Sequence, residues 1–194
     1  MSLFTDRAES AFKKGHRHLF LPLPYTIFVL TMKNFRIGHG YDVHRLAEGL
    51  PLRLGGISIE HEKGCVAHSD GDVLIHALCD ALLGAVALGD IGLHFPDTSD
   101  EFRGIDSLIL LERTMQLVRK AGYTPVNVDC TLALQRPKVR PYIDSMRQKL
   151  ATAMGIDVNC ISIKATTTEH LGFEGREEGV AAWAVALVTA NDKP

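Results

Sequence analysis

The sequence predicts a single α/β (α+β) domain in which helices pack on one face of a mixed β-sheet. Three observations predict it. Residues 36–190 alternate between short runs typical of strands and longer runs with helical periodicity, without an internal repeat or a long linker. A chain of 194 residues has the size of one domain and can bury a core without disulfide or metal staples. Its composition, 46% hydrophobic and 23% charged, excludes collagen-like, wholly disordered and multi-pass membrane proteins.

The strands are indicated by apolar runs of strand length and by glycine turns. We expect strands over Arg36–His44, Thr124–Leu134, Ile161–Thr168 and Val180–Thr189, and a second strand region with a glycine turn over Leu52–Glu60. A glycine-rich loop joins the last two strands.

Helical spacing of apolar residues predicts three helices. The first covers Asp72–Leu88 and ends at Gly89, with Ser69 or Asp70 as its N-cap. The other two cover Ser107–Ala121 and Pro141–Met154, and each ends at a glycine. The segment from 89 to 98 is too rich in glycine and proline for a helix or a strand, so we expect a loop there.

The first residues of the chain differ in character from the rest. A polar, basic piece precedes the apolar run Leu19–Met32, which contains prolines and is shorter than the roughly 20 residues of a membrane span. No small-residue cleavage site follows it, and Asp6 and Glu9 weigh against a transit peptide. We expect residues 1–35 to form a poorly ordered extension, or a stretch translated from upstream of a start at Met32, and residues 36–190 to form the domain.

The net charge and the cysteine spacing limit which binding partners and which cellular compartment we expect. The net charge of -2 and a pI of about 6.5 give no broad basic surface, so we expect no nucleic acid as a partner, and no membrane either. The four cysteines stand far apart without a Cys-x-x-Cys pair, which favours buried free thiols in a reducing compartment. A bacterial cytoplasm fits this best, and a plastid remains the alternative.

Histidine gives the strongest chemical signal, because six of the nine histidines lie between His39 and His94. Residues i and i+2 of a strand face the same side, so Asp42 and His44 lie side by side. His76 could supply a third ligand and leave the fourth position of a tetrahedral zinc site open, which is the catalytic arrangement. The alternative is a capped helix with a solvated acidic face.

Four further segments carry candidate chemistry. His68 and Ser69 lie where the chain enters the first helix, and free backbone N–H groups there attract phosphate. The loop up to residue 98 could carry function or be an ordinary helix exit. Gln135–Arg140 places three cations before a helix, which suits a nucleotide diphosphate or a solvated helix start. Glu169 follows three threonines and could hold a hard cation such as Mg²⁺, and a threonine-rich strand is the alternative.

Together these segments resemble the 2-C-methyl-D-erythritol 2,4-cyclodiphosphate synthase family of the non-mevalonate isoprenoid pathway. The matching segments are Arg36–His44 (RIGHGYDVH), Ala67–Asp72 (AHSDGD), His76–Leu78 with Asp80–Gly84, Gly89–Gly92, Phe95–Thr98, Pro137–Lys138, and Lys164–Glu169 through Phe173 to Arg176. They run in order over residues 36 to 188. Two positions depart from the pattern: Ser99 stands where the family often has Asp, and Leu134 stands where a small Ala is common.

The resemblance implies a homotrimer with three active sites between neighbouring subunits. It implies that Asp42, His44 and His76 bind one Zn²⁺ per subunit, that Glu169 binds a second divalent ion, Mg²⁺ or Mn²⁺, and that His68 and Thr167 stabilise the transition state. The residues that would contact substrate are Asp42, Val43, His44, His68, Ser69, Asp90, Ile91, Gly92, Phe95, Pro96, Asp97, Thr98, Ser99, Leu134, Gln135, Arg136, Pro137, Lys138, Val139, Arg140, Ala165, Thr166, Thr167, Thr168, Glu169, Phe173 and Arg176. Phe173 and Arg176 would lie near the trimer axis, where an isoprenoid diphosphate is a further candidate ligand.

The implied activity is that of a phosphorus–oxygen lyase. It converts 4-diphosphocytidyl-2-C-methyl-D-erythritol 2-phosphate into the 2,4-cyclodiphosphate and releases CMP. Two alternatives stay open: a zinc-dependent phosphohydrolase that acts on a nucleotide diphosphate, and a non-catalytic trimer that binds isoprenoid phosphates. The paired segments around Lys138 and Glu169 suit a whole CDP group and favour cyclisation.

Overall fold

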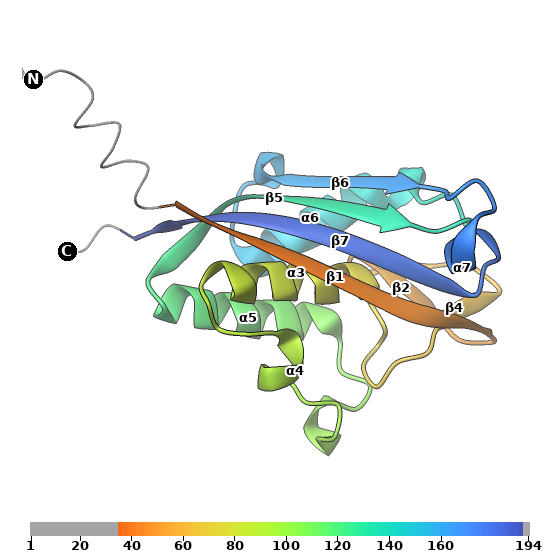
Figure 1. Cartoon of the computed structure of the whole chain (residues 1–194), viewed down its shortest axis with the longest axis horizontal. Helices are drawn as coiled ribbons and strands as arrows, with labels where there is room; N and C mark the ends of the chain where they lie inside the picture. The colour runs from red at the N-terminus through yellow and green to blue at the C-terminus, as the bar shows by residue number, and fades with distance from the viewer. Residues whose placement is uncertain (1–34, 192–194) are drawn as a thin grey trace, which may run out of the picture. The chain divides into compact units, whose positions relative to one another are not determined.

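A five-stranded mixed sheet forms the centre of the computed structural model, which describes residues 35–191 (Figure 1). The strands are β1 (Phe35–Glu48), β4 (Lys63–Cys65), β5 (Tyr123–Ala133), β6 (Ile161–Thr166) and β7 (Gly179–Ala190), in the order β4-β1-β7-β5-β6. Only β5 and β6 pair in parallel, and the other neighbours are antiparallel. A separate hairpin, β2 (Leu52–Leu54) and β3 (Ile57–Ile59), turns at Gly55 and Gly56, both with positive φ.

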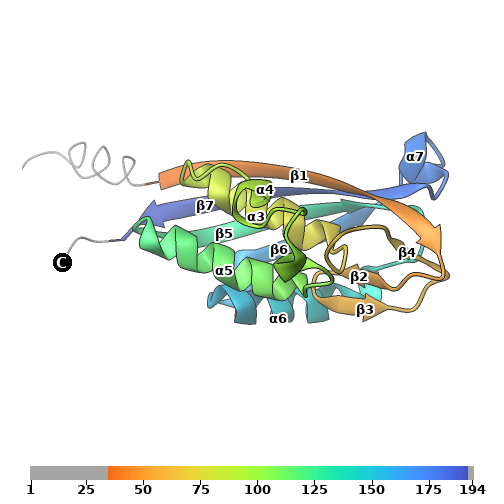
Figure 2. The same ribbon diagram turned by 90° about the horizontal axis from the view of Figure 1, so that it is seen from below.

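Three long helices cover one face of this sheet (Figure 2). They are α3 (Val73–Ala85), α5 (Ser107–Lys120) and α6 (Ile143–Met154). The core lies between the two layers and contains Leu74, Leu78 and Leu82 of α3, Leu132 of β5, and Met146 and Leu150 of α6. The predicted α/β domain with a mixed sheet is confirmed.

Short elements complete the described chain. One-turn helices lie at α4 (Ile91–His94) and α7 (Gly172–Gly175), and 3-10 turns at Asp100–Phe102, Arg140–Tyr142 and Val158–Cys160. The prediction that residues 89–98 contain no helix is therefore wrong, because Asp90 caps α4 by accepting a hydrogen bond from the Leu93 N–H. The glycine-rich connection before β7 likewise contains α7, and β4 was not predicted.

The start and end of α3 also differ from the prediction. The N-cap is Asp72, whose side chain accepts from the Ile75 N–H, rather than Ser69 or Asp70. The helix ends at Ala85, before Gly89. Asp72 is fully buried, since its carboxylate also accepts from the N–H groups of Gly55 and Gly56 in the hairpin turn. Burial raises its pKa, against the effect of these hydrogen bonds. This carboxylate does not belong to a solvated acidic face.

The backbone of α3 lies directly on β1. A Cβ at Gly38 would overlap the backbone carbonyl oxygen of Ala81, and one at Gly40 would overlap that of Ala77. Glycine is therefore required at both positions by close approach of a helix to a strand. The contact fixes how far α3 stands from the side chains that follow on the same face of β1.

The opposite face of the sheet is exposed and partly apolar. Ile37 is 72% exposed, and Tyr41, Val43, Trp183 and Val185 are also exposed. Tyr41 and Trp183, register partners on β1 and β7, have ring centroids 5.2 Å apart. A patch of this kind on neighbouring strands is typical of an interaction surface.

Three of the four cysteines are buried and Cys160 is half-buried, all as free thiols, as predicted. Burial raises the pKa of Cys65, Cys79 and Cys130 to about 12, so these thiols are unreactive. No helix within residues 35–191 has the length and hydropathy to cross a membrane. The predicted N-terminal extension lies outside the described residues, apart from Phe35, which begins β1.

We expect Gly40→Ala to destabilise the fold by about 1–3 kcal/mol, because the added methyl group pushes α3 away from β1. Urea unfolding measures the effect. Gly84→Ala is the matched control: Gly84 lies on α3 with open space around its Cβ position. That variant gains helix propensity and should be at least as stable as the wild type. Equal stability of Gly40→Ala and wild type would contradict the close contact.

Candidate active site

Asp42, His44 and His76 converge where β1 passes under α3. His44 Nε2 lies 3.0 Å from His76 Nδ1, His76 Nδ1 lies 3.1 Å from Asp42 Oδ2, and His44 Nε2 lies 3.3 Å from the same oxygen. The two β1 residues stand at i and i+2, as the sequence predicts, and α3 supplies the third. The structure therefore brings together all three residues predicted to bind zinc.

The chemistry of this donor triangle fits a cation. Each of the three atoms either carries a proton or offers a lone pair, so at least one of the three contacts joins two donors or two acceptors. Hydrogen bonds alone therefore cannot satisfy the group. Ligands of a tetrahedral zinc ion with bonds of 2.0–2.1 Å are about 3.3 Å apart, close to the observed separations. The residues fit a divalent metal ion.

The pKa values of the two histidines shift in opposite directions. Burial lowers the pKa of His44 more than the Asp42 carboxylate raises it. Burial also lowers the pKa of His76, but the hydrogen bond and charge of Asp42 outweigh that effect and leave its pKa above the ordinary value. The Asp42 carboxylate therefore favours the charged form of His76 more than that of His44.

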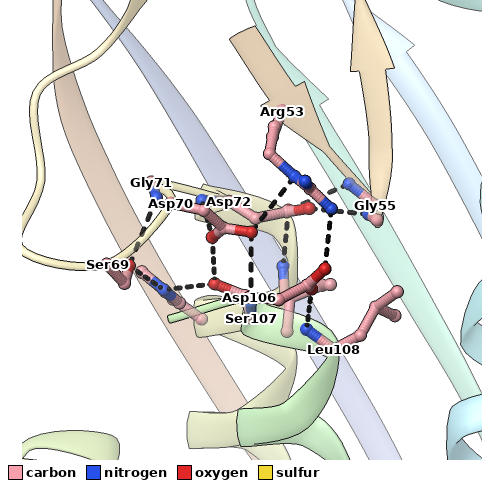
Figure 3. A network of polar contacts seen from close by, with 12 residues as sticks. Arg53, Gly55, Ser69, Asp70, Gly71, Asp72, Asp106, Ser107 and Leu108 are labelled. Atoms are coloured by element: carbon pink, nitrogen blue, oxygen red, sulfur yellow. Dashed lines mark hydrogen bonds and ion pairs between the residues drawn. The ribbon is translucent and has the colours of Figure 1, made fainter. Parts of the chain in front are cut away.

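A network of polar groups, drawn in Figure 3, contacts His76 at Nε2, the ring nitrogen that does not belong to the donor triangle. His76 Nε2 lies 3.0 Å from Ser107 Oγ and 3.1 Å from Ser69 Oγ. Ser107 donates from both its hydroxyl and its backbone N–H to Asp70, and Arg53 forms ion pairs with Asp70 and Asp106. The sequence analysis did not identify Ser107 or Arg53. An N-cap Asp followed by Ser at the start of α5 was the one available signal.

A cavity of about 370 Å³ opens beside the triangle. It is lined by His44, Ala67, His68, Ser69, His76, Ile91, Gly92, Phe95, Pro96, Asp97, Phe102, Ile105 and Leu110. Most of the predicted substrate residues between His44 and Asp97 therefore lie around this cavity. Phe102, Ile105 and Leu110 add an apolar wall that the sequence analysis did not foresee.

The remaining residues of that predicted group lie at the rim. His68 Nε2 is 3.0 Å from the backbone oxygen of Ser99, and Ser99 caps the 3-10 turn that follows. Asp90 caps α4, and Thr98 is exposed. Val43 lies between Asp42 and His44, so its side chain faces the other side of the sheet, where it is 42% exposed.

A second, smaller cavity of about 120 Å³ contains the other predicted group. It is lined by Leu134, Pro137, Lys138, Val139, Arg140, Ala165, Thr166 and Thr167. The Thr167 hydroxyl donates to Glu169 Oε1 at 2.8 Å, and Glu169 has a positive φ of 52°. The two cavities share no lining residue, so His68 and Thr167 lie in different cavities of one chain.

Several predicted substrate residues line neither cavity. Arg136 forms ion pairs with Glu62 and Glu177, Arg176 pairs with Glu178, and Gln135 accepts a hydrogen bond from the His170 N–H. Thr168 donates to the Leu171 carbonyl, and Phe173 packs beside Gly179. His61, Glu62 and Glu177 form another group with ligand atoms close together, but Arg136 already neutralises both of its carboxylates.

Comparisons with known proteins found similar sequences and similar folds. A model of the YgbB family matches residues 35–189. The 2-C-methyl-D-erythritol 2,4-cyclodiphosphate synthase of Porphyromonas gingivalis is 59% identical over 158 residues, which cover 81% of this chain and 98% of that protein. A solved 2C-methyl-D-erythritol-2,4-cyclodiphosphate synthase in a CDP-bound form matches with a TM-score of 0.73 and 42% identity, covering 79% of this chain and 99% of that one. The bifunctional IspDF of Campylobacter jejuni matches 81% of this chain with a TM-score of 0.79 and 42% identity, and this chain spans 43% of that longer protein.

Proposed function

The chain belongs to the YgbB family, and we propose that it cyclises a CDP-linked methylerythritol phosphate at the donor triangle of Asp42, His44 and His76. Its activity is that of a 2-C-methyl-D-erythritol 2,4-cyclodiphosphate synthase, a lyase of isoprenoid biosynthesis. The observation that carries the proposal is the triangle itself, three ligand atoms 3.0–3.3 Å apart beside the larger cavity. The substrate is 4-diphosphocytidyl-2-C-methyl-D-erythritol 2-phosphate, and the products are the cyclic diphosphate and CMP.

The reaction needs positioning more than a strong base. The 2-phosphate of the substrate attacks the β-phosphorus, the bond to the α-phosphate oxygen breaks, and CMP leaves. A phosphate monoester with a second pKa of about 6 is already mostly dianionic at neutral pH, so no side chain must first remove a proton. Two anionic groups must instead be held together, and aligned intramolecular attack can contribute about 7–11 kcal/mol.

The chain's own residues divide this work. Asp42, His44 and His76 would hold Zn²⁺, which when bound polarises phosphate oxygens and offsets their charge. His68 and Ser69 hold the 2-phosphate, and His68 together with Thr167 stabilises the charge that develops in the transition state. Asp90 and the backbone around Gly92 hold the methylerythritol hydroxyls. The apolar wall of the cavity excludes water, which favours cyclisation over hydrolysis.

The smaller cavity suits the nucleotide. Lys138 and Arg140 line it and can neutralise a diphosphate, and the loop from Leu134 to Arg140 supplies backbone groups for the base and ribose. Glu169, held by Thr167, would bind the second divalent ion, Mg²⁺ or Mn²⁺, which would offset the charge of the diphosphate. The CDP-bound relative supports nucleotide binding in this fold.

A homotrimer would bring the two cavities together between neighbouring subunits. His68 and Thr167 belong to different cavities, so the nucleotide cavity of one subunit has to meet the metal-side cavity of its neighbour. The exposed apolar face with Ile37, Trp183 and Val185 offers the surface for this assembly. Phe173 and Arg176 would then lie near the axis, where an isoprenoid diphosphate could bind. We place this enzyme in the bacterial cytoplasm, as its bacterial relatives and reduced thiols suggest.

Product analysis tests the activity. Purified protein with Zn²⁺, Mg²⁺ and the CDP-linked substrate should give the cyclic diphosphate and CMP in equal amounts, measured by ³¹P NMR. A linear methylerythritol phosphate with CMP would identify a phosphohydrolase, and no turnover would identify a binding protein. Either result would contradict the proposal.

We expect His76→Ala to lose bound zinc and nearly all turnover while the fold survives. The substitution removes one of three ligands and leaves the α3 backbone on β1 unchanged. Metal analysis of the purified variant, steady-state turnover and circular dichroism measure the three outcomes. Full activity in a zinc-free His76→Ala protein would refute the metal assignment.

We expect Lys138→Ala mainly to raise KM, by roughly 10- to 100-fold, because one charge-assisted contact to the diphosphate is lost. The value of kcat should change much less. Lys120→Ala, at the exposed end of α5, is the control and should match the wild type. An unchanged KM in Lys138→Ala would count against a nucleotide site in the smaller cavity.

We expect Val185→Glu to dissociate the trimer. Val185 is 41% exposed on the outer face of β7, and assembly would bury three like charges together. Gln116→Glu, exposed on α5 in the helical layer, is the matched control. Sedimentation velocity should give a trimer for the wild type and control, and a monomer for Val185→Glu. A trimeric Val185→Glu protein would place the assembly surface elsewhere, and a monomeric wild type would contradict the trimer.

A further inference from the structure

The two ring nitrogens of His76 have different partners. Its Nδ1 points to Asp42 and His44, and its Nε2 lies 3.0 Å from the Ser107 hydroxyl. A neutral imidazole carries one proton, and only the other nitrogen can bind a metal ion. His76 therefore works as a ligand through Nδ1 only when its proton sits on Nε2.

The network behind His76 fixes that proton. Ser107 Oγ donates its only proton to Asp70 Oδ1, because an ionised carboxylate accepts and does not donate. The hydroxyl then has only lone pairs left for His76. The contact of 3.0 Å is a hydrogen bond only if Nε2 carries the proton.

Asp70 is held rigidly in its role as acceptor. The Ser107 backbone N–H donates to Asp70 Oδ2 at 3.1 Å, so Ser107 contacts both carboxylate oxygens. Arg53 Nε forms an ion pair with Oδ2 at 3.2 Å, Ser107 is buried, and the Asp70 side chain is only 10% exposed. Three elements therefore meet in the network: the hairpin strand β2, the segment before α3, and the first turn of α5 (Figure 3).

We propose that Ser107 and Asp70 are positioning residues that hold His76 as the Nε2–H tautomer, with Nδ1 turned to the metal. The proposal rests on the zinc site proposed above and adds to it the residues that act through His76. Ser69 does not select a tautomer: its hydroxyl lies 3.1 Å from the same nitrogen and accepts from the Gly71 N–H, but it keeps a proton and a lone pair, so it can donate to Nε2 or accept from it.

Asp70→Asn tests the direction of the hydrogen bonds with almost no change in shape. Two donors, the Ser107 backbone N–H and Arg53, face Oδ2, whereas the only backbone donor to Oδ1 is the Asp72 N–H at 3.3 Å. The new amide group therefore keeps its oxygen at the Oδ2 position and turns its NH₂ toward the Ser107 hydroxyl. Ser107 then accepts from residue 70 and donates to His76 Nε2. The proton of His76 moves to Nδ1, where it blocks the metal.

Zinc affinity and the tautomer are the two readouts. We expect Asp70→Asn and Ser107→Ala to bind Zn²⁺ about 10- to 100-fold more weakly than the wild type in competition with a chelator. In metal-free protein at alkaline pH, ¹⁵N NMR should show that the Nε2–H tautomer of His76 predominates in the wild type. In Asp70→Asn this tautomer should no longer predominate over the Nδ1–H tautomer. The His76→Ala spectrum assigns the signals. If Ser107→Ala does not fold, Asp70→Asn alone tests the proposal.

Asp106→Asn is the matched control. Asp106 pairs with the same Arg53 and caps the same helix, but it does not contact the Ser107 hydroxyl. Asparagine keeps the cap, so zinc affinity should stay within about threefold of the wild type. Unchanged zinc affinity in Asp70→Asn, or retention of the Nε2–H tautomer in it, overturns the proposal. Failure of the wild type to bind zinc would instead reject the metal site itself.

Discussion

The backbone contact between α3 and β1 is the constraint on which the candidate site depends. Gly38 and Gly40 leave no side chain between strand and helix, so the carbonyl groups of Ala77 and Ala81 approach the strand directly. Because a strand turns every second residue to the same side, the face that holds these glycines also holds Asp42 and His44. One turn of α3 then places His76 within 3.1 Å of Asp42. The spacing Gly-x-Gly-x-Asp-x-His is therefore both a packing surface and two thirds of the ligand set.

The side chains of the segment from His68 to Asp72 point in two directions. His68 and Ser69 line the cavity, whereas Asp70 and Asp72 point into the protein and bind the start of α5 and the turn between β2 and β3. A fully buried carboxylate such as Asp72 is costly unless it is well hydrogen-bonded, and it accepts from three backbone N–H groups. The charges that anchor this segment therefore keep His68 and Ser69 at fixed positions beside the cavity. In the function that we propose, stability and substrate binding would depend on the same short segment.

Local patterns in the sequence predicted the parts of the fold that local physics decides. Apolar runs of strand length predicted four of the five strands of the sheet, and helical spacing predicted α3, α5 and α6. The i, i+2 relation of Asp42 and His44 predicted two corners of the donor triangle. The N-cap of α3 was predicted wrongly, because Asp70 and Asp72 are equivalent in sequence and differ only in their tertiary partners. Ser107 could not be predicted from spacing, since it reaches His76 from a helix that begins 31 positions later. The turn at α4 was missed because a single cap, Asp90, outweighed the glycine content around it.

The separation of the two cavities connects assembly with catalysis. Attack on the β-phosphorus requires the 2-phosphate and the nucleotide diphosphate at one place, yet the metal-side residues and Lys138 lie in cavities without a common wall. With the substrate contacts that we propose, a single chain would bind either half of the substrate and would not bring the halves together. In the trimer that we propose, the apolar outer face supplies the association energy, and association itself completes the site. Such an enzyme would hold little catalytic power as a monomer, however well each chain folds, because alignment of the reacting groups arises only between copies.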